Sequence, residues 1–283
     1  MNVLVLGATG YIGAAVTERL VAAGHRVTAA SRSAGPATVP AGATPVAVDL
    51  TDPAAVAALV TDDVDTVVHA AAPLGDADLP LVEALAGTGR PLLWTSGIWV
   101  LGRTGGADED APVAPIAIVG PRRRVEENVL AAGGVVLRPG VVHGRGGGSI
   151  PGLLVAWAQQ LGHGRWVGGD ESPRWPMVHV DDLADLYLLA LTAARPGTVL
   201  HGVTEPGVRA GELARAAARG QGAEATAVAW PEADAATELG APFAEALGLD
   251  QVVTADRARA LGWSPGRPGA ADDLATGSYV PAG

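Results

Sequence analysis

The first thirteen residues constrain the fold of this chain more than any other stretch. Residues 2–6 are mostly apolar, and three glycines follow at once, at positions 7, 10 and 13. Apolar residues then recur at helical spacing from Ile12 to Leu20, and Gly24 provides a helix stop. The pattern predicts a buried strand, a tight turn and an amphipathic helix. Such a turn brings backbone N–H groups and the positive end of a helix dipole to a pyrophosphate.

The turn therefore predicts a dinucleotide site. Its last glycine permits close packing of helix on strand, and a tight turn without a ligand is the alternative. We expect six residues of this stretch to contact the dinucleotide: Gly7, Thr9, Gly10, Tyr11, Ile12 and Gly13.

Composition excludes several classes of site. The chain has 283 residues, 48% of them hydrophobic, and no cysteine, so disulfides and thiolate chemistry are excluded. The six histidines are scattered, and no metal site is expected. No apolar run is long enough to span a bilayer, and Met1 leads directly into the first strand, which predicts a cytoplasmic protein without a membrane partner.

The net charge and the type of basic residue exclude further classes of partner and site. The formal charge of -11 argues against nucleic-acid binding, since phosphate contacts need a basic surface. All 19 basic residues are arginine. The absence of lysine excludes a Schiff base and a lysine acid or base, whatever its origin in codon usage.

The end of the second predicted strand, residues 26–30, bears on the choice of cofactor. An acidic residue there would bind the ribose 2′-hydroxyl of NAD. This chain has Ser31 and then Arg32, a hydroxyl and a guanidinium suited to the 2′-phosphate of NADP. We therefore favour NADP(H) over NAD(H), the alternative being that Arg32 is a solvated loop residue.

Later strands are predicted at 44–48, 65–69, 91–95 and 135–138, with helices between them. The carboxyl ends of parallel strands meet at one edge of a sheet, so the residues that follow them are candidate ligand contacts. They are Asp49, Leu50, Ala70, Ala71, Ser96, Pro139 and His143. Asp49 is a candidate partner for the adenine amine, although helix capping explains it equally well. Ser96 suits a substrate carbonyl or a local turn.

The rest of the chain is less informative. Residues 101–115 are predicted to form an exposed loop, residues 233–247 one helix, and Leu261 to Pro265 the end of the last helix. Asp181 and Asp182 are expected to cap a helix over 183–191. Three tryptophans, Trp157, Trp166 and Trp175, indicate a small core in preference to a pocket wall.

Together these motifs resemble the extended short-chain dehydrogenases/reductases, the NAD-dependent epimerase/dehydratase family. The resemblance covers roughly residues 1–190 and a common ending. It rests on an ordered set of signatures: Gly7-Ala-Thr-Gly10-Tyr-Ile-Gly13, Asp49-Leu-Thr-Asp52, His69-Ala-Ala, Thr95-Ser96, Arg138-Pro-Gly-Val-Val-His143-Gly, Val178-His-Val-Asp-Asp-Leu-Ala184 and Leu261-Gly-Trp263.

The resemblance implies an α/β fold, a Rossmann-like doubly wound parallel sheet with a smaller C-terminal substrate-binding portion. We expect residues 1–143 and 178–205 to form the dinucleotide-binding core, and 144–177 and 206–283 the smaller portion, within one compact unit. The family is often dimeric, so a homodimer is an expectation. A small-molecule substrate is implied as well.

The chain departs from the family at its catalytic pair, Tyr-x-x-x-Lys, in which tyrosine transfers a proton and lysine holds the ribose. The tyrosine position falls at Ile118 or Val119, and the lysine position at Arg122 or Arg123. The family serine position falls on Gly97, next to Ser96. Isoleucine and valine cannot transfer a proton, whereas Arg122 could keep the ribose contact.

Three hypotheses follow. The first is an atypical NADP(H)-dependent oxidoreductase acting on a small, largely apolar substrate. Its substitute proton donor would be Ser96 or His143, with Tyr187 as a third candidate, and Arg122 is a further candidate catalytic residue through its positive charge. The second is a non-redox isomerase, cyclase or dehydratase that uses the dinucleotide structurally or transiently. The third is a catalytically silent NADP-binding sensor.

Overall fold

A seven-stranded parallel sheet dominates the computed structural model, which describes residues 1–281. The order across the sheet is β11-β7-β5-β4-β1-β2-β3, and all neighbours are parallel. This confirms the predicted fold class. The strands are β1 (Asn2–Leu6), β2 (Arg26–Ser31), β3 (Thr44–Ala47), β4 (Thr66–His69), β5 (Leu92–Thr95), β7 (Val135–Pro139) and β11 (Val199–Gly202).

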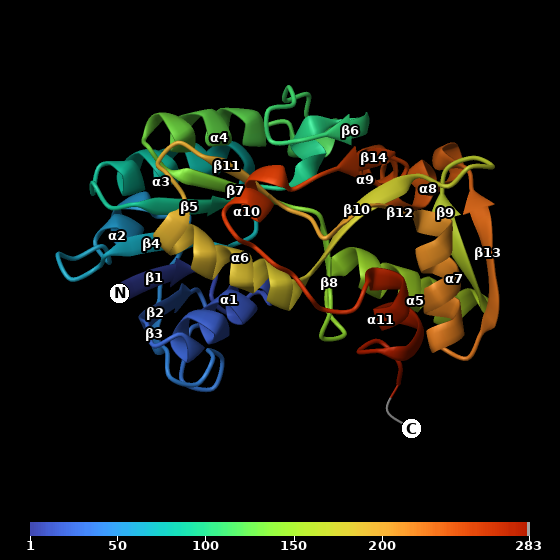
Figure 1. Cartoon of the computed structure of the whole chain (residues 1–283), viewed down its shortest axis with the longest axis horizontal. Helices are drawn as coiled ribbons and strands as arrows, with labels where there is room; N and C mark the ends of the chain where they lie inside the picture. The colour runs from blue at the N-terminus through green and yellow to red at the C-terminus, as the bar shows by residue number, and fades with distance from the viewer. Residues whose placement is uncertain (282–283) are drawn as a thin grey trace.

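Helices cover both faces of this sheet (Figure 1). Its central strands are therefore buried on both sides, which is why they appear as continuous apolar runs. One face carries α1 (Tyr11–Ala22) and α6 (Val180–Ala193), and the other carries α2 (Pro53–Ala57), α3 (Asp78–Ala86) and α4 (Arg122–Ala131). The chain winds outward from β1 to β3, then from β4 to β11. The carboxyl ends of β1 and β4 thus flank the switch point where such sheets bind ligands.

The smaller part of the molecule, at the right of Figure 1, contains short sheets and helices. Its core includes Trp157, Trp166 and Trp175, all buried, so these tryptophans form a core as predicted. The sheets pair β8 (Val141–His143), β10 (Arg174–His179) and β12 (Glu205–Arg209), and β9 (His163–Val167) with β13 (Glu224–Trp230). The helices are α5 (Ser149–Leu161), α7 (Ala210–Gly220), α8 (Glu232–Leu239), α9 (Ala241–Leu247) and α11 (Ala270–Thr276).

Residues 246–263 pack against the large sheet's core through side chains such as Val253, Ala258 and Trp263. They include β14 (Gln251–Val253) and α10 (Asp256–Ala260). The predicted division into two portions stays a prediction. Within residues 1–281, no helix combines the length and apolar composition needed to span a bilayer.

The expectation of an exposed loop over residues 101–115 is only partly right, because residues such as Arg103, Asp108 and Asp110 are exposed but the segment also contains a strand and buried side chains. Residues Thr104–Ala107 form β6, which pairs in parallel with β14. Glu109 is buried, and its carboxylate accepts hydrogen bonds from the backbone N–H groups of His201 and Arg257. The partners lie far away in the chain, so local composition did not reveal them. The 3-10 turns η2 (Ile98–Leu101) and η3 (Ala117–Val119) flank the segment.

Three further boundaries need correction. The helix predicted over 233–247 is two helices, because Gly240 adopts φ +85 between α8 and α9. The last helix is α11, well beyond Pro265. The cap of α6 is His179, whose Nδ1 accepts a hydrogen bond from the Asp181 N–H at 3.1 Å, and the helix begins at Val180.

His69 makes stability depend on pH. Its ring is buried and stacks on that of Trp94 with the ring centroids 3.7 Å apart, and neither ring nitrogen has a hydrogen-bond partner among residues 1–281. Burial lowers the pKa of His69 to about 3. As the pH falls below about 6.5, the His69 side chain binds a proton in the unfolded chain but stays neutral in the folded chain. The free energy of unfolding therefore decreases. We expect wild type to lose about 2 kcal/mol more than His69→Phe between pH 7.5 and pH 5, measured by urea denaturation. Parallel pH profiles for the two proteins would contradict this.

Candidate functional site

The glycine turn at the end of β1 fits a dinucleotide. Gly7 has φ +81, and a Cβ there would lie 2.5 Å from the Ala71 Cα. A Cβ on Gly13 would lie 2.1 Å from the Gly7 carbonyl oxygen. Gly10 precedes α1 and has no side chain to cap its first N–H groups, which stay available to an anion. The turn is thus both tightly packed and open toward a ligand.

A first cavity of about 290 Å³, the Ser31 cavity, lies on one side of the turn. Ser31 is buried there and its hydroxyl has no hydrogen-bond partner in the described chain, while Arg32 and Ser33 line the same space. Asp49 also lines it. One oxygen of Asp49 accepts the Thr51 N–H, which lowers its pKa, whereas Asp52 caps α2. Asp49 is therefore not the cap.

A second cavity of about 220 Å³, the Ser96 cavity, lies on the other side of the turn. Gly10 lines the first cavity and the next residue, Tyr11, lines the second, so the two adjoin. The wall of the Ser96 cavity is mostly apolar. It is formed by Tyr11, Ile12, Ser96, Gly97, Ile98, Trp99, Arg122, Pro139, Gly140, Val141, Val142, Gly148, Ser149 and Ile150.

The structure brings nearly all of the predicted contacts to these two spaces. Gly7, Thr9, Gly10, Ser31, Arg32, Asp49, Leu50, Ala70 and Ala71 line the Ser31 cavity, and Tyr11, Ile12, Ser96, Arg122 and Pro139 line the Ser96 cavity. Gly13 packs directly against the backbone of Gly7. Gly13 and His143 are the two predicted residues that line neither cavity.

Arg122, and not Arg123, reaches the cavity. Arg123 is exposed and pairs with Glu127 one turn along α4. The family's lysine position is therefore Arg122 and its tyrosine position Ile118, which is 43% exposed. A Cβ on Gly97 would lie 2.6 Å from the Arg122 Nη1. The glycine at the family's serine position thus makes room for the larger arginine side chain.

Ser96 is the hydroxyl left free at this edge of the sheet. Its side chain is buried, lines the cavity and has no hydrogen-bond partner within residues 1–281. The neighbouring Thr95 donates to the His69 carbonyl at 2.6 Å and contacts the buried Tyr187 hydroxyl. Tyr11 lines the cavity, but its hydroxyl donates to the Gly144 carbonyl at 2.8 Å and burial raises its pKa. Because it is already bound to Gly144, the Tyr11 hydroxyl is not free to donate to a substrate.

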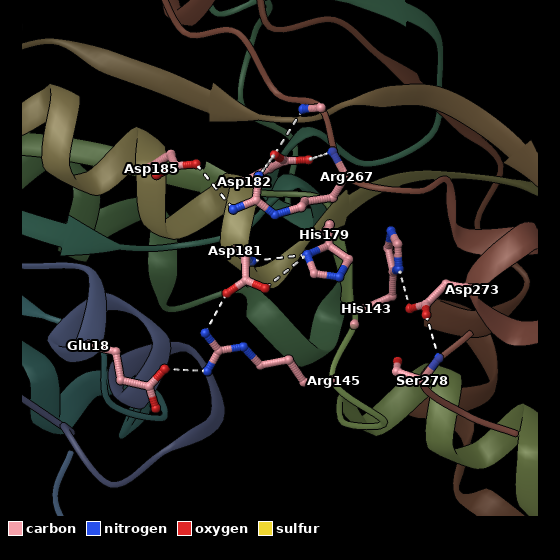
Figure 2. Close-up of polar contacts among 12 residues, drawn as sticks. Glu18, His143, Arg145, His179, Asp181, Asp182, Asp185, Arg267, Asp273 and Ser278 are labelled. Carbon is pink, nitrogen blue, oxygen red and sulfur yellow. Dashed lines mark hydrogen bonds and ion pairs between the residues drawn. The ribbon is translucent and has the colours of Figure 1, made fainter. Parts of the chain in front are cut away.

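His143 is fully buried in β8, and Figure 2 shows its ring beside Asp273. Its Nδ1 donates to the Asp273 carboxylate at 3.2 Å, and its ring packs edge-on against His179 at 5.2 Å. Burial lowers the pKa of His143, the Asp273 bond opposing this. The strand-end loop predicted for it is a strand, so the side chain points into the core. The structure thus gives His143 a structural role and no contact with the cavity.

The loop over residues 144–147 leads to Gly148 in the wall of the Ser96 cavity, and the C-terminal turn holds this loop. The Tyr279 hydroxyl accepts from the Gly144 N–H at 2.9 Å and donates to the Gly147 carbonyl. The Ser278 hydroxyl accepts from the Gly146 N–H at 2.8 Å. Asp273 links the same turn to His143 by accepting the Ser278 N–H.

Sequence reasoning missed the start of α5. Ser149 and Ile150 line the Ser96 cavity, beside Gly148 at the helix N-terminus. The glycine run followed by serine and a run of apolar residues is a helix-start signal that could have placed them. The described residues contain no cluster of three side chains suited to a metal ion.

Comparison with known proteins agrees with this geometry. Residues 3–83 match the model of the NAD dependent epimerase/dehydratase family. The 2-alkyl-3-oxoalkanoate reductase of Stenotrophomonas maltophilia is 31% identical over 230 residues, which are 71% of this chain and 68% of the reductase. The chain belongs to the NAD-dependent epimerase/dehydratase family. It is thus an extended short-chain dehydrogenase/reductase with an altered catalytic pair.

Two solved structures show the same fold. The human epimerase family protein SDR39U1, solved with NADPH, is 27% identical with a TM-score of 0.78, over 98% of this chain and 99% of that one. The UDP-glucose 4-epimerase of Thermus thermophilus, solved with NAD, is 22% identical with a TM-score of 0.79, over 99% of both chains. Both of these proteins were solved with a bound dinucleotide.

Proposed function

We propose that this protein is an NADP(H)-dependent oxidoreductase of a small, largely apolar organic substrate, with Ser96 and Arg122 in place of the family's usual pair. One observation carries the proposal. An unpartnered serine hydroxyl and an arginine side chain line the same small cavity, directly beside the glycine turn. The reductase among the relatives supports redox chemistry, though for its own substrate.

The residues of the Ser31 cavity support NADP over NAD. The Ser31 hydroxyl and the Arg32 guanidinium would hold a 2′-phosphate, and no acidic residue occupies the Ser31 position to repel it. The first N–H groups of α1 would hold the pyrophosphate. Bound NADPH would supply the hydride.

The chain's own groups would serve the substrate oxygen. Arg122 presents N–H donors and a permanent charge, which stabilise negative charge as it develops on a carbonyl oxygen. A guanidinium does not give up its proton in proteins, so Arg122 is an electrostatic catalyst and not the acid. The Ser96 hydroxyl would pass a proton to the oxygen and regain one from water. The net reaction would consume a carbonyl compound, NADPH and a proton, and release an alcohol and NADP⁺.

The proposal is tested by titrating the purified protein with NADPH and NADH, then following NADPH consumption with a panel of small ketones and aldehydes. We expect NADPH to bind, and at least one carbonyl compound to be reduced at a rate that Ser96→Ala lowers. Failure to bind either cofactor would refute the proposal. Binding with substrate conversion but no net NADPH loss would favour the isomerase hypothesis, and binding with no conversion of any compound the sensor.

Cofactor choice gives a separate prediction. Arg32→Ala removes the charge proposed for the 2′-phosphate, so the Kd for NADPH should rise roughly tenfold or more while that for NADH stays unchanged. Both constants can be measured by fluorescence titration. An equal change for the two cofactors would assign Arg32 to the loop surface and remove the argument for NADP.

A further inference from the structure

The Ser96 cavity contains a positive charge that no carboxylate of the described residues pairs with. Arg122 is partly buried in the cavity wall, and its guanidinium lies within ion-pair distance of no acid in residues 1–281. Burial lowers the pKa of Arg122, and Glu126 and Asp78 oppose this only through longer-range attraction. A cation removed from water without a partner is unfavourable. An anionic group on a ligand would relieve that cost.

The nearest acid on the same helix is kept from Arg122 by another arginine. Glu126 lies one turn along α4, in the position from which it could pair with Arg122. Both its oxygens are instead bound by Arg138, whose Nη2 donates at 2.6 Å and whose Nε donates at 3.1 and 3.2 Å. Both side chains of this pair are buried. The ion pair with Arg138 therefore leaves Glu126 unavailable as a partner for Arg122.

Asp78 is the other acid that influences Arg122, but within residues 1–281 it makes no ion pair with Arg122, and only one of its two oxygens has a hydrogen-bond partner. One of its oxygens accepts the Leu74 N–H at 3.0 Å. Burial raises the pKa of Asp78, so its negative charge is disfavoured where it lies. Neither acid neutralises Arg122.

The remaining wall defines what surrounds such an anion. Ile98, Trp99, Val141 and Ile150 provide an apolar surface, and the Ser96 hydroxyl adds a donor that has no partner of its own. A space of about 220 Å³ must accommodate the reacting end of the cofactor as well as the substrate, so the substrate is small. One arginine balances one negative charge, which favours a carboxylate over a dianionic phosphate.

We propose that the substrate is a small oxo acid, whose carboxylate pairs with Arg122 while its carbon chain packs against Ile98, Trp99 and Ile150. This rests on the proposed function, and names the substrate class of that site. A guanidinium has five N–H donors in a planar fork, so it holds a carboxylate through two bonds and still presents a donor toward the oxo group.

The test measures binding to the intact protein saturated with NADP⁺, by isothermal titration calorimetry. The probes are 2-oxobutanoate, 2-oxohexanoate and 3-oxohexanoate, each compared with its neutral amide. We expect at least one acid to bind roughly tenfold or more tightly than its amide, as a charge-assisted bidentate pair would give. Arg122→Met should abolish this difference, and Arg122→Lys should keep part of it because the charge remains without the fork.

Arg123→Met is the matched control. It removes an arginine from the same helix turn, but one that is exposed and paired with Glu127, so the preference for the acid should be unchanged. Urea denaturation of each variant checks that it folds. If Arg122→Met does not fold, the comparison of each acid with its amide on the wild type still tests whether the site prefers a carboxylate.

Two results would overturn the inference: no acid preferred over its amide anywhere in the series, or an acid preference that persists in Arg122→Met. A protein that reduces neutral ketones with NADPH but shows no acid preference would refute the oxo-acid assignment and leave the proposed function standing. A protein that binds neither cofactor would refute both.

Discussion

Replacing Gly13 with alanine should abolish tight NADPH binding. The new Cβ would lie 2.1 Å from the Gly7 oxygen and 2.8 Å from the Gly7 carbonyl carbon, so α1 must move away from β1. The backbone N–H groups at the start of α1 would move with it, away from the pyrophosphate. We expect the NADPH affinity to fall by roughly tenfold or more, and stability to fall by about 1–3 kcal/mol from overpacking. Fluorescence titration and urea denaturation measure the two.

Gly152→Ala is the control for this substitution. Gly152 lies inside α5, and a Cβ there meets nothing within 4 Å. The same change should therefore stabilise the protein by about 0.5–1 kcal/mol through helix propensity, without altering NADPH binding. If Gly13→Ala bound NADPH as tightly as wild type, the turn would not be the pyrophosphate site.

Arg138→Met should cause the largest loss of stability. It leaves the Glu126 carboxylate buried without the three hydrogen bonds that Arg138 now donates. An uncompensated buried charge costs about 3–5 kcal/mol, which urea denaturation at neutral pH would register as a large drop in the midpoint.

Two comparisons separate the loss of the pair from the loss of a side chain. Removing both charges, in Arg138→Met with Glu126→Leu, should restore most of the stability, because a buried pair can be replaced by apolar residues at little cost. On the surface of the same helix, Arg123→Ala breaks the exposed pair with Glu127 and should cost only about 0.3–0.5 kcal/mol. A small effect of Arg138→Met alone would mean that Glu126 finds another partner.

The large sheet could be predicted because its signals are local. Most strands are short apolar runs that end at or just before glycine, serine or aspartate, while β4 is followed by alanines, and the family signatures fix their order. The segments that were mispredicted depend on distant partners instead. Glu109 looks like part of an exposed acidic run, yet it is buried against the backbone of His201 and Arg257. Similarly, the break at Gly240 follows from one backbone angle that a helical pattern does not reveal.

The candidate site also has one part that could be predicted from the sequence and one that could not. The cofactor contacts follow strand ends, so their positions could be predicted from the sheet. The side chains around Arg122 could not, because the choice between Arg122 and Arg123 depends on which face of α4 meets β5. The room that Gly97 leaves for Nη1 is visible only in three dimensions. His143 was misjudged because the strand β8 turns its side chain away from the loop edge.

The hydrogen bonds of Tyr279 have a consequence for how the protein matures on the ribosome. They join residues 135 positions apart in the chain. The glycine turn needs only the first strands and can form early, whereas the loop over residues 144–147, next to Gly148 in the wall of the Ser96 cavity, gains these bonds only when residues 273–279 emerge. We therefore expect a chain that lacks the C-terminal turn, whether still being synthesised or cut by a protease, to bind the dinucleotide without discriminating among substrates.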